Sequence, residues 1–343
     1  RKSIGIDYSQ DIGNKQTLDT EFTYNQGRNV DFPAQAMDLI TDDTYLFNTK
    51  HTIRFSSKSA LKRIQNSVFG SFVDHTMSNE LREGPKMADA ITDAKTKNYG
   101  FRTELTFNPG NISKWYIGLD HRHEQADGTR FRTLLKGPMT GKTMVDNVWQ
   151  GSEINKSSIF SELQLNHGSF DFVWSSRLEY NTADANNPTE FFSNTFELSN
   201  SSLNSNFSFG IKNAFKGGSI ALWVGKAQRS GSLTERFINY LPVGLDPYEL
   251  IGNPELKSEI NHQIDLVLDL NNNQRAIQFN LFTARLNDYI TSVIDETLVP
   301  SMASAPGVRR FANLDKAIKL GFEFDYSEQL SEVLTHGFSI AYT

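Results

Sequence analysis

Hydrophobic and polar residues alternate along much of this chain, and the pattern is clearest in Gly252–Leu270, GNPELKSEINHQIDLVLDL. A polar edge that contains proline runs to Ile260, and strict alternation follows from Asn261. Side chains at every second position of a β-strand share a face. The segment therefore predicts a strand with an apolar face, carrying Ile264, Leu266, Leu268 and Leu270, and a polar face, carrying Gln263, Asp265 and Asp269.

The same period of two recurs from Ile4 to the end of the chain and predicts about fourteen strands joined as antiparallel hairpins. Aromatic residues make up 12% of the chain, with 25 Phe and 11 Tyr. Because aromatic side chains favour strands, this composition supports an all-β fold.

The predicted connections alternate in length. Turns such as His167–Gly168 and Lys216–Gly218 are short, whereas every second connection is a long link. The long links are Asn25–Thr44, His75–Lys95, Ala126–Lys156, Thr182–Ser205, Gly231–Ile260 and Val293–Gly307. Outer-membrane barrels have short turns at one end and long loops at the other, and their strands need about 9–11 residues to cross. We therefore predict a transmembrane antiparallel β-barrel.

In a barrel of this kind the apolar face meets lipid and the charged face lines the lumen. The positions that we expect to face lipid are Ile264, Leu266, Leu268, Ile318, Leu320, Phe322 and Phe324. Alternation is the same when the apolar face is turned into a protein core. A soluble all-β binding protein, either a sandwich or a solenoid, is therefore the alternative.

Bulk composition and the absence of known motifs argue against several classes of protein and of functional site. A net charge of −6 over 343 residues argues against a nucleic-acid partner, and the absence of cysteine leaves no disulfide or thiolate site in this segment. No apolar run approaches the ~18 residues of a spanning helix. We find no Gly-x-Ser-x-Gly motif, zinc-binding helix or phosphate loop, so we expect no enzyme. The chain opens on Arg1 and its last alternation stops at Thr343, so we expect it to be part of a longer protein.

Four runs in the second half resemble the TonB-dependent outer-membrane receptors. They are Thr234–Phe237 (TERF), Gly252–Glu259 (GNPELKSE), Phe279–Ile290 (FNLFTARLNDYI) and Arg310–Phe324 (RFANLDKAIKLGFEF). Ser258 stands where the family usually has proline, which is a minor departure. Each run alone is a weak signal, but together they occur in the order and spacing of the family.

The resemblance implies that residues 1–343 form the middle of a barrel of about 22 strands with a plugged lumen. The N-terminal plug domain and the C-terminal strands would then be missing from this chain. It also implies a receptor and transporter for nutrient import in the outer membrane of a Gram-negative bacterium. Its partners would be outer-membrane lipid, its own plug domain and the TonB complex.

Two runs in the first half, Asp31–Asp43 and Val68–Asn79, resemble the TonB-dependent copper receptors. In that subgroup a His-x-Met pair on the barrel joins a Cys-x-x-x-Met pair on the plug to hold copper. The matching pair is His75 and Met77, which implies a copper ion as the substrate. Two residues apart on an extended backbone they share a face, and imidazole and thioether suit copper, especially Cu(I). Because the chain has 7 His and 6 Met, a chance pair with polar and packing roles is the alternative.

Basic residues in the links suggest a different substrate, an anionic iron–siderophore, since arginine clusters bind such groups. They are Arg130, Arg132, Arg229, Arg236, Arg309 and Arg310. Ordinary ion pairing inside a polar lumen also explains them, and we favour it.

Four further residues and one acidic group have weaker interpretations. Met139 and Met144 share one long link and could guide a soft metal, although loop packing is the simpler explanation. His121 and His123 lie on the apolar face of their strand and fit an interfacial rim better than a metal site. The carboxylates in the first link, Asp38, Asp42 and Asp43, are expected to brace that loop and attract cations.

Overall fold

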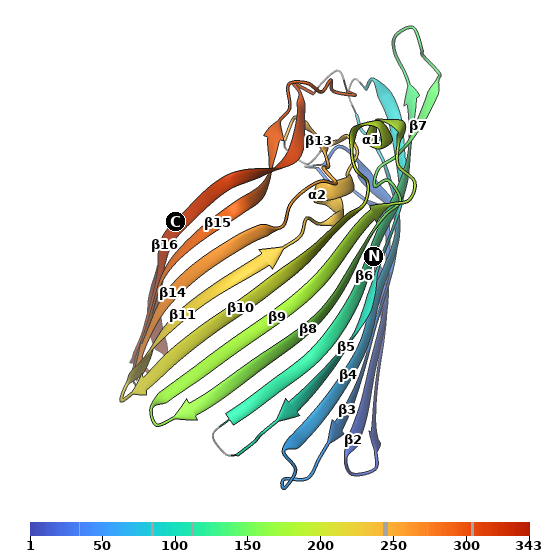
Figure 1. Cartoon of the computed structure of the whole chain (residues 1–343). Coiled ribbons are helices and arrows are strands. Elements are labelled where there is room, and N and C mark those ends of the chain that lie inside the picture. Colours follow the sequence, from blue (N-terminus) through green and yellow to red (C-terminus); the bar gives the residue numbers. More distant parts are fainter. Residues whose placement is uncertain (34, 84–85, 111–112, 243–245, 273, 303–304) are drawn as a thin grey trace.

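The computed structural model describes residues 1–33, 35–83, 86–110, 113–242, 246–272, 274–302 and 305–343, and its strands form one curved sheet (Figure 1). The first long strands are β1 (Lys2–Ile12), β2 (Gln16–Val30), β3 (Asp38–Arg54), β4 (Leu61–Ser78), β5 (Ala88–Phe107), β6 (Ser113–Leu134) and β8 (Ser152–His167). They are followed by β9 (Phe170–Ala185), β10 (Asn200–Phe215), β11 (Gly218–Arg229), β14 (Glu259–Asn271), β15 (Arg275–Ile294), β16 (Val308–Ser331) and β17 (Leu334–Tyr342).

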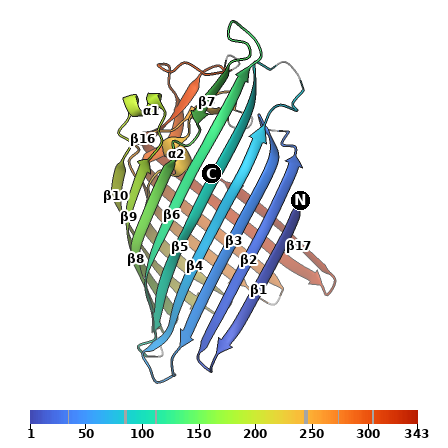
Figure 2. The same cartoon turned by 90° about the vertical axis from the view of Figure 1, so that its right-hand side faces the viewer.

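These long strands are the roughly fourteen that the alternation predicts, and each pairs antiparallel with the next one along the chain. Three short strands, β7 (Thr143–Asn147), β12 (Leu241–Pro242) and β13 (Glu249–Ile251), bring the sheet to 17 strands within the residues that the structure describes. Seen from the side, β1–β6 lie on one side of the curved sheet and the last strands on the other (Figure 2). Among the described residues, β1 pairs only with β2, and β17 only with β16.

Short turns and longer connections alternate through the whole sheet, as predicted. The short turns lie at one end, and the connections that carry β7, β12, β13 and two short helices lie at the other (Figure 1). The helices are α1 (Glu190–Thr195) and α2 (Leu233–Phe237). Within the part of the chain that the structure describes, neither is long and apolar enough to cross a membrane.

The predicted strand ends at the loop side are wrong. We expected Asn25–Thr44 to be a long link, but β2 runs to Val30 and β3 starts at Asp38. In the same way β6 continues to Leu134, deep into the expected link Ala126–Lys156. These extensions have polar side chains on both faces, and the alternation that marks a strand therefore stops before the strand does. Backbone pairing continues beyond the point where the alternation ends.

The register places the seven expected lipid-facing residues on one face. Ile264 and Leu320 both lie opposite Thr283, while Leu266 and Phe322 both lie opposite Leu281. Ile318 and Leu320 are 62% and 63% exposed, and contact of this face with lipid stays a prediction. Asp265 is on the other face, where it lies opposite Trp223.

The buried core lies at the loop end instead of between two layers. One cluster joins Phe237 of α2 to Ile154 of β8 and Ala183 of β9. A second joins Phe192 of α1 to Ile251 of β13 and Val308 of β16. The connections therefore fold back onto the sheet and fix its upper rim.

Candidate functional site

The structure brings His75 and Met77 together at the loop end of β4. Both line one cavity of ≈ 700 Å³, and Asp42 of β3 lines it with them. Asp42 lies directly opposite His75 in the β3–β4 pairing, and Leu39 lies opposite Met77. An imidazole, a thioether and a carboxylate therefore face one polar, half-enclosed space.

Met37 is a side chain near this cavity that the sequence analysis did not single out. The Thr92 hydroxyl lies 3.8 Å from the Met37 sulfur, and Thr92 is directly opposite Met77 in the β4–β5 pairing. A second thioether thus lies close to the strand that carries Met77. The signal was available in the resembling run Asp31–Asp43, but only the pairing of three strands shows its closeness to Met77.

The carboxylates of the first link brace the loop, as expected for Asp38 and Asp43. Asp38 pairs with Arg82 at 2.6 Å, and Asp43 pairs with Arg28 at 2.7 Å. Asp42 differs, because it accepts a hydrogen bond from Thr44 at 2.9 Å and lines the cavity of His75. Of the three, Asp42 alone is placed to act on a cation in that space.

Arg130 and Arg132 form ion pairs with the same carboxylate, that of Asp146. Their guanidinium groups lie 2.9 and 2.8 Å from Asp146, and Arg130 is buried and donates to the carbonyls of Asn239 and Tyr240. Both arginines therefore fasten β7 to β6, and Arg130 also ties β6 to the segment that follows α2.

The other four loop arginines also have partners within the chain. Arg309 pairs with Asp246 at 3.3 Å and Arg310 with Asp295 at 3.1 Å. Arg229 lies between Glu235 and Glu259, and Arg236 donates to backbone carbonyls. Ion pairing, the explanation that we favoured, therefore accounts for five of the six, and hydrogen bonds to backbone carbonyls account for Arg236.

Met139 and Met144 lie far along a projecting arm. β6 and β7 pair as a hairpin, with Met144 in β7 and Met139 in its turn, so the expected plain loop is partly a strand. The two side chains are 52% and 41% exposed. The structure therefore does not gather them with His75 and Met77 around one cavity.

His121 and His123 lie on the apolar face of β6, as predicted. Each ring stacks against an aromatic side chain of β5, at 6.0 Å from Phe101 and 4.9 Å from Tyr99. Their Nδ1 atoms lie 2.8 Å from Ser157 and Asn155 of β8. These contacts form an aromatic and polar rim.

The runs that resemble the receptor family interlock at the loop end. Gly252 donates to the carbonyl of Ile238, and Asn253 to that of Glu235. A Cβ on Gly252 would meet backbone atoms of Arg236 at 2.5 Å, so only glycine allows this close approach. These residues hold the loop in one conformation and do not line the His75 cavity.

The packing of α2 against this loop shifts the pKa values of two of its charged side chains, Arg236 and Glu235. Burial lowers the pKa of Arg236 to about 10, while its guanidinium donates to the carbonyls of Gly231, Pro254 and Leu256. Burial also opposes ionisation of Glu235, but hydrogen bonds from Arg229 and Ser232 outweigh it and hold the pKa of Glu235 below its ordinary value.

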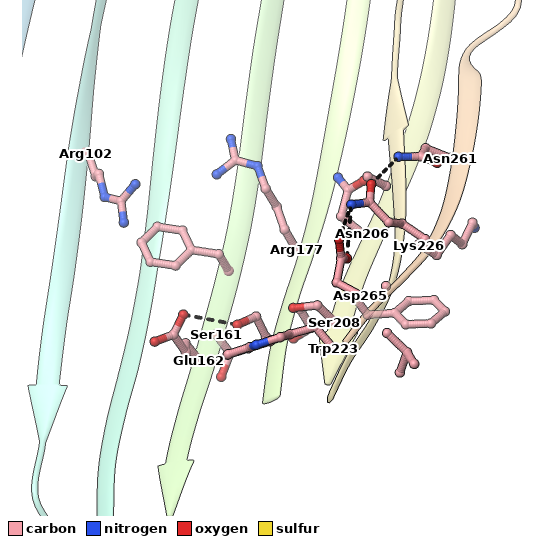
Figure 3. A pocket seen from close by; sticks show the side chains of 18 residues that line it. Arg102, Ser161, Glu162, Arg177, Asn206, Ser208, Trp223, Lys226, Asn261 and Asp265 are labelled. Atoms are coloured by element: carbon pink, nitrogen blue, oxygen red, sulfur yellow. Dashed lines mark hydrogen bonds between the residues drawn. The ribbon is translucent and has the colours of Figure 1, made fainter. Parts of the chain in front are cut away.

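A second cavity, of ≈ 460 Å³, lies on the polar face at mid-sheet (Figure 3). Arg102 stacks over Phe160 at 4.1 Å, and Arg177 makes two 2.7 Å bonds to Asp120. Glu162 accepts a hydrogen bond from Ser175. The charged side chains of this wall are thus paired or stacked within the chain, between apolar ones such as Trp223, and charged groups of this kind suit a lumen that solvates other groups.

Comparisons with known proteins agree with this architecture. The family described as "TonB dependent receptor-like, beta-barrel" matches residues 3–343. The copper transporter OprC superposes with a TM-score of 0.80 at 14% identity, over 99% of this chain and 51% of that chain. The apoprotein form of the FrpB iron transporter from Neisseria meningitidis gives 0.65 at 11%, over 99% and 50%. The alcaligin receptor FauA from Bordetella pertussis gives 0.57 at 11%, over 99% and 53%.

This chain thus spans about half the length of these solved structures. Among curated proteins, none matches it. The family match extends over nearly the whole chain, and the structural neighbours are Gram-negative outer-membrane proteins. The chain therefore belongs to the TonB-dependent receptors, as an outer-membrane β-barrel of that family.

Proposed function

We propose that this chain is the barrel part of a receptor that imports copper in a TonB-dependent manner, with His75 and Met77 as its barrel-side ligands. The observation that carries the proposal is their shared cavity at the loop end. In an outer-membrane barrel the long loops are extracellular, so this end is the one that copper would reach first.

The donor set fits a soft metal. A thioether favours Cu(I), and imidazole binds copper in either oxidation state. Asp42, opposite His75, would raise the local concentration of cations without being a soft ligand itself. Two ligands do not complete a copper site, so we assign the remaining ones to the plug domain, with Met37 as a further sulfur near Met77.

An iron–siderophore is the second candidate, because iron transporters and siderophore receptors share this fold. An anionic ligand of that kind needs guanidinium groups that are available to it. Five of the six loop arginines, including Arg130, Arg132 and Arg309, are bound to carboxylates of this chain, and Arg236 is bound to backbone carbonyls. We therefore favour copper over an iron–siderophore.

The test is the copper content of the complete receptor, purified from outer membranes and measured by elemental mass spectrometry. We expect His75→Ala and Met77→Ala each to lose bound copper. Matched controls are His123→Ala and Met139→Ala, which remove the same groups elsewhere in the chain. Unchanged copper in the first pair would refute the assignment. Iron bound only with a siderophore, and no copper, would favour the second candidate.

A further inference from the structure

A row of cationic and polar side chains crosses the apolar face of the sheet, close to the loop-side ends of β11 and β14. Lys226 of β11 lies opposite His262 of β14, and His262 lies opposite Arg285 of β15. Neighbouring strands are about 4.8 Å apart, so the row spans roughly 10 Å. These side chains share the face of Ile264 and Leu266, which is the face that meets lipid in an outer-membrane barrel.

An apolar groove lies immediately next to this row. The next row across the sheet is displaced by two positions toward the short turns. It consists of Trp174 on β9, Phe209 on β10, Val224 on β11 and Ile264 on β14. Members of both rows line one surface cavity of ≈ 590 Å³. The cations thus lie at the loop-side, outward edge of a hydrophobic groove.

The cations in this row are not neutralised within the described part of the chain. Lys226 donates to the Ser205 hydroxyl at 3.0 Å and lies 5.9 Å from the Phe207 ring. Arg285 donates to the Asn287 amide oxygen at 3.1 Å. These partners are uncharged. β11 has no carboxylate, and those of β14, which are Glu259, Asp265 and Asp269, are on the opposite face because each is an odd number of positions from His262.

This arrangement matches the chemistry of a phosphorylated lipid. A fixed positive charge at the membrane surface attracts anionic headgroups, and arginine and lysine bind phosphate oxygens strongly. The acyl chains of the same molecule would lie in the groove beside Trp174 and Phe209. Because the long-loop end is extracellular, the row faces the outer leaflet.

We propose that Lys226, His262 and Arg285 bind the phosphate groups of an outer-leaflet phosphoglycolipid of the lipid A type, with its acyl chains in the groove between β9 and β15. The site is separate from the His75 cavity, because it lies on the opposite face of the sheet. It does not depend on which nutrient is imported.

The test uses the complete receptor in detergent and native mass spectrometry with bisphosphorylated lipid A as the probe. Removing one charged hydrogen bond costs about 1.4 kcal/mol or more, which corresponds to about tenfold in affinity. We therefore expect Lys226→Gln with Arg285→Gln to weaken lipid A binding by at least about tenfold. The matched control is Lys212→Gln with Lys319→Gln, which changes the charge equally on the lumen face of β10 and β16 and should bind as the unaltered receptor does.

Two further arms distinguish phosphate recognition from general lipid contact. Dephosphorylated lipid A should bind the unaltered receptor at least about tenfold more weakly than the phosphorylated form, and this comparison needs no variant to fold. Lys226→Arg should retain binding. The proposal is overturned if the double variant binds lipid A as the control does, if dephosphorylated lipid binds equally well, or if inorganic phosphate alone binds as tightly as the lipid.

Discussion

The side chain of Asn313 on β16 makes two hydrogen bonds with the backbone of Lys257: it accepts from the Lys257 N–H at 2.9 Å and donates to the Lys257 carbonyl at 3.1 Å. It also donates to the carbonyl of Asp288 at 2.7 Å. One amide therefore joins three parts of the chain that lie far apart in sequence.

Replacing this amide should loosen the loop locally. We expect Asn313→Ala to destabilise the segment 252–259 by about 1–3 kcal/mol, because it leaves polar backbone groups of Lys257 and Asp288 without partners. Amide hydrogen exchange of that segment in the complete receptor measures the effect. Asn213→Ala, which removes a single 3.2 Å bond at a short turn, should leave the exchange of this segment unchanged. Equal protection in both variants would contradict the role of Asn313.

Arg236 should be among the costliest side chains to remove. It is fully buried and its guanidinium donates to three backbone carbonyls, so Arg236→Met orphans all three. The expected loss is about 3 kcal/mol or more in the stability of the loop around α2. Limited proteolysis measures it. The control is Arg275→Met, because Arg275 is in an exposed ion pair with Glu328, and such pairs contribute about 0–1 kcal/mol.

Acid should destabilise the local structure around α2. The pKa of Glu235 is held below its ordinary value of 4.5, so its stabilising contribution is fully present above 4.5 and is lost as the pH falls through the lower folded value. We expect hydrogen exchange in 231–238 to accelerate over that acid range. Glu235→Gln should be less protected at neutral pH and should show a weaker acid dependence. An unchanged acid dependence in this variant would show that another group controls this destabilisation.

Gly252 should not tolerate even a methyl group. A Cβ there would meet the backbone carbonyl carbon and oxygen of Arg236 at 2.5 Å, and backbone atoms cannot swing away as a side chain can. We expect Gly252→Ala to displace the loop at a cost of about 1–3 kcal/mol, measured by thermal unfolding of the purified receptor. Gly5→Ala is the control, because its Cβ would have only the Thr23 hydroxyl at 3.9 Å. Equal melting of the two variants would be the contrary result.

If the copper proposal is right, the thioether sulfur of Met77 gives the receptor a preference for soft metal ions. Met77→Leu keeps the apolar bulk but removes the soft donor, so it should weaken binding of Ag(I), a stand-in for Cu(I), more than binding of Zn(II). Isothermal titration calorimetry of the complete receptor with each ion gives the two affinities. Parallel loss of both ions would mean that Met77 acts through packing and not through its sulfur. Met144→Leu should leave both affinities as they are.

The period-two alternation predicted the long strands well where one face is apolar and the other charged, as in Ile318–Tyr326. It failed in stretches such as Ala126–Leu134, which the structure assigns to β6. There the side chains no longer separate by polarity, because the sheet extends past the apolar band. Strand pairing in that region comes from the backbone and the neighbouring strands, which a single segment of sequence does not reveal.

By itself, the sequence determined the class of fold, the alternation of turns and loops, and the pairing of His75 and Met77 on one face. Those features depend on residues near one another in the chain and on the strict period of a strand. The tertiary structure decided the rest. It placed Asp42 opposite His75, matched five of the six loop arginines to carboxylates, and aligned Lys226, His262 and Arg285 across three strands. Cross-strand neighbours are set by register and sheet order, which arise only when distant segments pair.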